Sequence, residues 1–384
     1  MGGEHLAEDT GKKKIGLLRI VLSVVTFIII VYIGIALSTG FAPGLSWIAG
    51  FFPERITPIA ADEYYFEVGR NRVFTDLDGA IAAAGSMGIQ VLNDVGLETL
   101  SDSLRFDFPA IASNSGTAIV FDISGTAVRV FNGSEIIASF DSLGPIVSAS
   151  INENGWFAVS AQEGGGYRGV VRAYNDRGAE VFRFFSGVGY ILSAEISSDN
   201  RTMAVLRLTE TGSQVIFYDL SGGAHRGIFD YQDGIILDIR FVSGGNLLAV
   251  STESIIYIDN SGSGRRVFDF SDKRLGRFIF GDNFVIIHLL DFGVGYSGTL
   301  MRIERNGQVF AELPTEIDII SMTQRNGYLA VLWSDGPAFL DSHFDEIQHY
   351  EPAVPIMGAT DFIFLNRYTA LAAGEHSAVV VRRY

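Results

Sequence analysis

The feature that most constrains this chain is a four-part unit of short apolar strands, which recurs at intervals of 36 to 46 residues after residue 61. Each unit has a strand ending in a tight turn, a strand rich in small residues, a strand ending in an acidic or Asn-Gly turn, and an aromatic strand. Clear examples span residues 191–233 and 235–273. The second strands begin near Ile81, Thr117, Trp156, Thr202, Leu247, Phe284, Tyr328 and Thr369.

Four-stranded repeats of this length are typical of β-propeller blades, because a blade cannot bury its own faces and must pack against its neighbours. We therefore expect an all-β fold, a single β-propeller of four-stranded blades over residues 62–384. The last unit stops after two strands, and the repeat region begins with two strands that lack partners, YYFEVG and RVFTDLDG. Pairing the two ends would close the ring without a long exposed edge. This count favours eight blades, and seven remain if residues 81–114 do not form a full blade.

Strand pairs such as AEISSDNRTMAVLRL and ASINENGWFAVSA resemble the inner hairpin of WD40-like and quinoprotein-like propellers. The repeats lack the Gly-His and Trp-Asp signatures of WD40 blades, so the resemblance implies an architecture and no particular partner. The whole chain also resembles an uncharacterised bacterial family of membrane-anchored propellers, a domain of unknown function. That resemblance implies no activity.

Residues 15–38 precede the repeats and predict a transmembrane helix. The run from Ile15 to Leu37 is interrupted only by Arg19, and its 23 residues are enough to cross a hydrocarbon core of about 30 Å. Basic residues cluster before the run and none follows it until Arg55. By the positive-inside rule, residues 1–14 form a cytoplasmic tail and the propeller lies outside the cell membrane, in an extracytoplasmic position.

Two alternatives concern this region. A cleaved signal peptide could end near Ala36-Leu37-Ser38, but the apolar run is longer than a signal-peptide core, which favours a retained single-pass anchor. Residues 39–61 form a linker. Its aromatic residues Trp47, Phe51 and Phe52 fit either a membrane interface or a plain stiff spacer.

Charge and cysteine content exclude several classes of function. From residue 20 onward the chain has 24 basic and 41 acidic residues, so it should repel nucleic acid, and we expect no nucleic-acid partner. It contains no cysteine, which excludes disulfides and thiolate metal sites.

No motif predicts a cofactor, a metal site or a catalytic residue. Residues 164–169 and 293–298 match G-x-G-x-x-G, but no helix follows either segment, so we interpret both as hairpin connections. His343 and His349 fall on the opposite strand face from Glu346, which argues against zinc. The acidic turns at 76–79, 152–155 and 197–200 fit tight hairpins better than calcium loops. The remaining histidines past the anchor are expected to be packed or surface residues: His225, His288 and His376.

The connections between strands two and three and between strand four and the next blade emerge on one face of a propeller. Here several are long or aromatic, and tyrosine and arginine dominate binding hot spots. We expect the following exposed residues to form a binding surface: Tyr167, Arg168, Tyr190, Tyr231, Arg274 and Tyr296. The alternative is a set of solvated loops with no partner.

Two functions remain open. The first is a membrane-anchored binding or scaffold module for a protein, peptide or glycan partner. The alternative is a propeller enzyme, a quinone-dependent dehydrogenase or a hydrolase, that uses the central channel. Carboxylates or arginines converging in the channel would favour the enzyme. The chain has only 3 tryptophans, which removes the Trp-docking pattern of quinoprotein blades.

Overall fold

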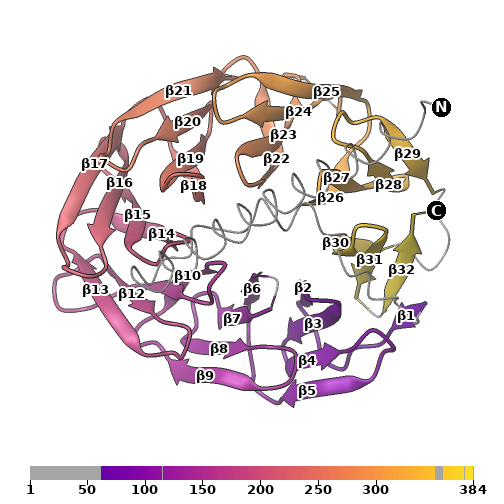
Figure 1. The fold of residues 1–384 in the computed structure, drawn as a ribbon, viewed down its shortest axis with the longest axis horizontal. Helices are drawn as coiled ribbons and strands as arrows, with labels where there is room; N and C mark the ends of the chain where they lie inside the picture. Colours follow the sequence, from indigo (N-terminus) through magenta and orange to yellow (C-terminus); the bar gives the residue numbers. More distant parts are fainter. Residues whose placement is uncertain (1–61, 115, 294, 351–357, 376, 384) are drawn as a thin grey trace, which may run out of the picture. The chain divides into compact units, whose positions relative to one another are not determined.

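The computed structural model describes residues 62–114, 116–293, 295–350, 358–375 and 377–383. Within them the strands form eight four-stranded antiparallel sheets, arranged around a central axis as the blades of a propeller (Figure 1). The predicted all-β fold is confirmed, and so is the count of eight blades. Residues 81–114, the weakest unit of the sequence, contribute to a complete first blade.

In seven blades the strands follow sequence order from the axis to the rim (Figure 1). Blades one to four consist of β2 (Val73–Leu77), β3 (Ala80–Gly85), β4 (Gly88–Leu92), β5 (Glu98–Asp102); β6 (Pro109–Ser113), β7 (Ala118–Asp122), β8 (Ala127–Phe131), β9 (Ile136–Asp141); β10 (Ile146–Ile151), β11 (Phe157–Ala161), β12 (Gly169–Tyr174), β13 (Glu180–Ser186); β14 (Tyr190–Ile196), β15 (Thr202–Thr209), β16 (Gly212–Asp219) and β17 (His225–Tyr231).

Blades five to eight consist of β18 (Ile236–Val242), β19 (Asn246–Ser251), β20 (Ser254–Ile258), β21 (Gly264–Asp269); β22 (Arg274–Phe280), β23 (Phe284–Leu290), β24 (Gly298–Glu304), β25 (Val309–Thr315); β26 (Ile319–Arg325), β27 (Tyr328–Trp333), β28 (Gly336–Leu340), β29 (Glu346–His349); and β30 (Ala359–Asn366), β31 (Thr369–Gly374), β32 (Ala378–Arg382) and β1 (Glu63–Tyr64).

The eighth blade closes the ring with strands from both ends of the repeat region. Its order is β30, β31, β32 and β1, so the C-terminal part supplies three strands and the N-terminal part supplies only the outermost one. The expected contribution of two strands from each end is therefore wrong. The segment RVFTDLDG contains β2, which is the inner strand of the first blade and pairs with β3.

The core lies in the seams between blades, and each of the eight seams contains one apolar cluster. The second and third strands are buried on both faces, as in β7, where every residue is buried. Fourth strands alternate instead, as in β17, because one edge and part of one face meet water. This explains why the second strand of each unit is a run of small and apolar residues.

Among the residues that the structure describes, no helix has the length and apolarity needed to cross a bilayer. The predicted tail at 1–14, helix at 15–38 and linker at 39–61 lie outside the described residues.

Candidate functional site

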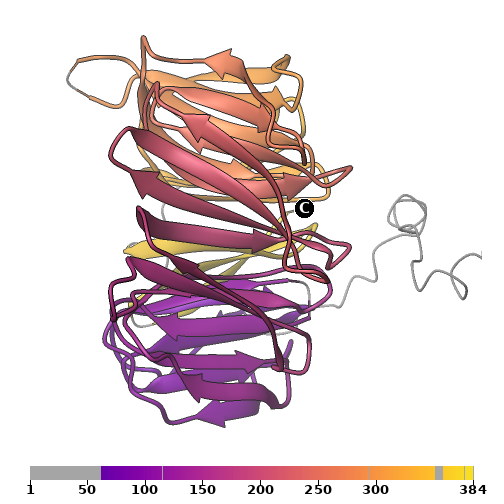
Figure 2. The ribbon, with the colours of Figure 1, turned by 90° about the vertical axis from the view of Figure 1, so that its left-hand side faces the viewer.

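The two faces of the ring carry different kinds of connection. We call the face with the connections from strand two to three and from each blade to the next the loop face, and the opposite face the turn face. Figure 2 shows the ring from the side, with its connections gathered at these two faces. Turn-face hairpins are closed by their own Asx side chains; Asn152 Oδ1, for example, accepts hydrogen bonds from the amides of Asn154 (3.0 Å) and Trp156 (2.9 Å).

Exposed apolar side chains gather on the loop face. The described connecting segments hold twelve exposed large apolar residues, and ten of them lie on this face. They include Leu143, which is 80% exposed, and Phe292, which is 71% exposed. The two on the turn face are Val95 and Leu97. Among the described connections, the loop face therefore exposes more large apolar side chains than the turn face, which favours it as a binding surface.

Three of the six predicted binding residues form one cluster on this face. Arg168 Nη1 donates a hydrogen bond of 2.8 Å to the Tyr190 hydroxyl, and its guanidinium carbon lies 5.3 Å from the centre of the Tyr190 ring. The Tyr167 ring lies 4.9 Å from that of Phe185. The nearby Val188 is 65% exposed. These side chains come from the β11–β12 connection and from the ends of β13 and β14.

Tyr231 does not belong to an exposed surface, and its prediction as an exposed binding residue is wrong. It is 5% exposed and lies in the apolar cluster between blades four and five. Its hydroxyl shares hydrogen bonds with Ser254 Oγ (2.9 Å) and Ser251 Oγ (3.2 Å). The residue ends a fourth strand, where the side chain can turn into the seam, so Tyr231 has a structural role.

Arg274 and Tyr296 are exposed as predicted, but they belong to blade six rather than to the Tyr167 cluster. Leu143, Val188 and Phe292 are exposed on the loop face but were not predicted, because only tyrosine and arginine were taken as the residue types of a binding hot spot. Val188 and Phe292 lie in connections that were singled out for length and aromatic content, so a search there for any large apolar residue would have found both.

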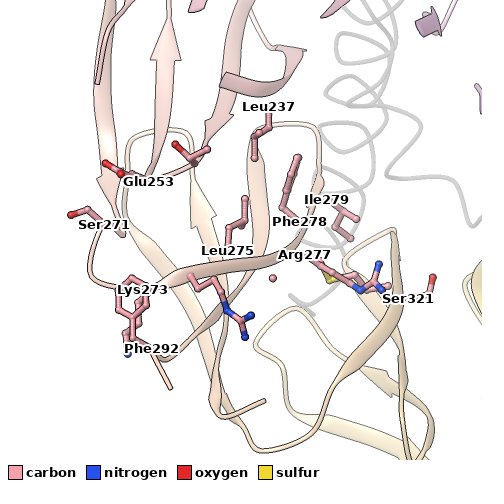
Figure 3. A pocket seen from close by; sticks show the side chains of 14 residues that line it. Leu237, Glu253, Ser271, Lys273, Leu275, Arg277, Phe278, Ile279, Phe292 and Ser321 are labelled. Atoms are coloured by element: carbon pink, nitrogen blue, oxygen red, sulfur yellow. The ribbon is translucent and has the colours of Figure 1, made fainter. Parts of the chain in front are cut away.

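A cavity of about 760 Å³ opens between blades five, six and seven. Its apolar wall comes from β18, β22, β26 and the connection after β23, and Figure 3 shows several of these side chains. Its apolar lining residues are Leu237, Leu275, Phe278, Ile279, Phe292 and Met322. Since Glu253, Ser271 and Lys273 also line it, the cavity reaches from loop-face connections to the inner strands. Its volume is in the range of known ligand sites.

The charged groups of this cavity are mostly cationic. Lys273, Arg274 and Arg277 line it against one carboxylate, Glu253. Lys273 pairs with Asp291, and the hydrogen bond between them raises the pKa of the lysine and lowers that of the aspartate. Arg277 Nε donates to the carbonyl of Ile319 at 2.5 Å.

Arg274 is exposed, and its side chain makes no hydrogen bond or ion pair with any residue that the structure describes. The net charge of the chain is −16, so this cavity is a local basic site on an acidic protein. Its arrangement suits an apolar group that carries a negative charge.

Residues 61–335 match the family of unknown function DUF5711. The chain belongs to this family. No curated protein matches it. The matched region runs from the closing strand β1 into blade seven.

Solved structures of other propellers resemble this member of DUF5711. BamB from Moraxella catarrhalis aligns with a TM-score of 0.54 and 14% identity, over 84% of this chain and 98% of that one. The C-terminal WD40 domain of Sif2 aligns with a TM-score of 0.59 and 13% identity, over 84% of this chain and 99% of that one. At such identity the likeness establishes the fold alone, as the resemblance of the inner hairpins predicted.

A second polar feature lies on the inner strands of blades four and five. Glu195 in β14 is 9% exposed, and burial raises its pKa to about 7; the neighbouring Arg240 opposes this shift and Asp238 adds to it. Burial also raises the pKa of Asp238, against the attraction of Arg240. Two carboxyls that are costly to ionise therefore lie near one arginine.

The histidines that the structure describes give no further site. His288 is buried, its Nε2 lies 2.9 Å from Thr315 Oγ1, and burial lowers its pKa. His343 packs its ring 5.0 Å from that of Phe310. Within the described part of the chain, no three His, Asp or Glu side chains are placed to hold a metal ion. The two glycine-rich segments are connections between strands two and three of blades three and six.

Proposed function

We propose that this protein is a membrane-anchored, extracytoplasmic binding module whose loop face holds a protein or peptide partner. The observation that carries the proposal is the concentration of exposed apolar side chains on one face of the ring, ten of twelve in the described connections. A large exposed apolar surface on a soluble domain is costly unless a partner covers it. The fold likeness to BamB and to a WD40 domain is compatible with a scaffold role.

The anchor of this proposal is the apolar run at 15–38, with the linker at 39–61 between it and the ring. The propeller itself supports one further point. Asp62 joins the ring at the turn face, where its carbonyl accepts a hydrogen bond from Val380 (2.9 Å) and its carboxylate pairs with Arg382 at the end of β32. The first described residue of the ring therefore lies on the face opposite the loop face.

The test is crosslinking in intact cells with the full chain, followed by identification of the captured proteins. Leu143→Glu combined with Val188→Glu places two charges on the loop face, and Leu97→Glu is the matched control on the turn face. We expect the double variant to lose partners that the wild type and the control both capture. A reproducible set captured equally by all three would contradict the proposal. If capture depends on intact cell-wall glycan, the partner is a glycan rather than a protein.

A second candidate is an enzyme that works in the central channel, and the pair Glu195 and Asp238 is the observation that favours it. A carboxyl with a pKa near neutrality can act as a general acid. Its test is turnover of chromogenic ester and glycoside substrates by the purified full chain. Activity that Glu195→Gln abolishes without unfolding the protein would support the enzyme; equal rates in both proteins would exclude this role of Glu195.

A further inference from the structure

The seam between blades five and six is built differently from the other seven. Neighbouring inner strands approach one another closely around the ring, as β10 and β14 or β26 and β30 do, whereas β18 and β22 do so least. The cavity of about 760 Å³ lies in this seam. The inner strands of this seam therefore leave room for a cavity, and the cavity adjoins the loop face.

The repeats themselves show what the open seam lacks. Several inner strands carry a β-bulge at the same position, and Leu192, Leu237 and Ile320 are the extra residues of blades four, five and seven. Leu192 packs against the cluster of the next seam, and so does Ile320. Leu237 does not pack in its own next seam; it is 43% exposed and faces the cavity together with Leu275 (Figure 3).

The rim of the cavity continues this apolar surface outward. Phe292 lines the cavity and is 71% exposed, and Tyr296 in the same connection is 51% exposed. Leu237 and Phe292 thus expose apolar area beside the cavity, and an inserted apolar side chain would bury it.

The cationic lining of the cavity favours an apolar group that carries a negative charge. Arg274 has no partner among the described side chains, and Arg277 engages a backbone carbonyl through only one of its nitrogens. A ligand carboxylate can therefore pair with Arg274 without displacing an existing ion pair. The chain as a whole carries a net charge of −16, so an anion is attracted to few places on it, and a cationic cavity adds selectivity to the pairing.

We propose that the cavity between β18 and β22 binds an extended segment of a partner polypeptide, which inserts an apolar side chain beside Leu237 and places an adjacent Asp or Glu carboxylate against Arg274. This proposal rests on the binding function of the loop face and names what that face recognises. The ligand is a polypeptide rather than a small molecule because the cavity continues into the exposed apolar rim.

The experiment uses the full chain in lipid nanodiscs as bait for a phage-displayed random dodecapeptide library. We expect enriched peptides to carry an apolar residue within two positions of Asp or Glu. Their affinity for the immobilised protein should fall at least about tenfold on Arg274→Glu and on Leu237→Ser, because each variant removes one half of the recognition. Arg177→Glu makes the same charge change at an exposed turn-face position and should leave affinity within about twofold of wild type.

Three outcomes would overturn the proposal: no enrichment, enriched peptides without the apolar and acidic pair, or binding that both cavity variants retain. Both substitutions lie at exposed positions, so a loss of folding is not expected, and the thermal unfolding midpoint of each variant checks this. Failure here remains distinguishable from failure of the proposed function. If Leu143→Glu with Val188→Glu removes cellular partners while the cavity variants keep them, the loop face binds by another region.

Discussion

Single buried side chains decide much of the chemistry of this ring, and Glu195 is the clearest case. Its carboxyl is 9% exposed, and burial raises its pKa from 4.5 to about 7. The folded state therefore favours the protonated form of the Glu195 carboxyl. Because the pKa of Glu195 is higher in the folded state, its protonation contributes fully to the free energy of unfolding below the unfolded-state pKa of 4.5. This contribution is lost as the pH rises through the folded-state pKa of about 7.

We therefore predict that Glu195→Gln stabilises the protein at pH 8 and has little effect at pH 4.5. The gain at pH 8 should be about 3 kcal/mol, since the cost of ionising the buried carboxyl disappears. Denaturant unfolding of both proteins across this pH range measures it. Because Asp238 raises the pKa of Glu195, the difference between the two curves reports Glu195 together with its coupling to Asp238. A difference that does not vary with pH would contradict the prediction.

Tyr231 and Tyr296 show why residue type alone could not predict the binding surface. Both are tyrosines in or beside connections of the loop face, yet one is 5% and the other 51% exposed. The sequence pattern places each residue correctly near a strand end. Which way the side chain turns depends on the partner serines Ser251 and Ser254, which belong to the next blade.

These contacts give a prediction at the same scale. Tyr231→Phe removes a hydroxyl that bonds two buried serines, so we expect a loss of about 1 kcal/mol in the free energy of unfolding. Tyr296→Phe, at an exposed position, should change it by less than about 0.5 kcal/mol. Equal effects in thermal unfolding would show that the hydroxyl network of Tyr231 contributes nothing.

At the scale of elements, the blades were predictable and their closure was not. The second strands fall within one residue of the predicted starts, as at Thr202, Phe284 and Tyr328, because strands buried on both faces leave an apolar run. The closing strand β1 has only two residues, and its pairing with β32 is a contact across the whole repeat region. No local pattern distinguishes an outer strand of one blade from the inner strand of another.

The short closing strand is held mainly by side chains. Tyr64, Phe66 and Val68 are each at most 4% exposed in the seam between blades eight and one, whereas the adjacent Tyr65 is 66% exposed. We predict that Tyr64→Ala costs about 3–5 kcal/mol of stability and opens the ring, while Tyr65→Ala costs less than about 0.5 kcal/mol. Denaturant midpoints compare them, and limited proteolysis should cut the Tyr64→Ala protein first.

At the scale of the whole molecule, the sequence could predict a loop face but not the cavity in it. The topology of four-stranded blades determines which connections share a face, and that follows from strand order alone. The cavity depends instead on how far β18 stands from β22, and on the exposed state of Leu237, whose counterpart Leu192 is packed. Such spacing is a property of the assembled ring, and no single repeat encodes it.

Membrane orientation is the last prediction of this kind, and the absence of cysteine makes it directly testable. Leu143→Cys, at an 80% exposed loop-face position, introduces a single thiol on the propeller, and Gly3→Cys introduces one in the N-terminal tail. If the basic residues before the apolar run keep the tail in the cytoplasm, as proposed, a membrane-impermeant maleimide should label the first variant in intact cells. The second should react only after permeabilisation. Labelling of Gly3→Cys in intact cells would reverse the proposed topology, and release of the Leu143→Cys protein into the medium would show that residues 15–38 are a cleaved signal rather than an anchor.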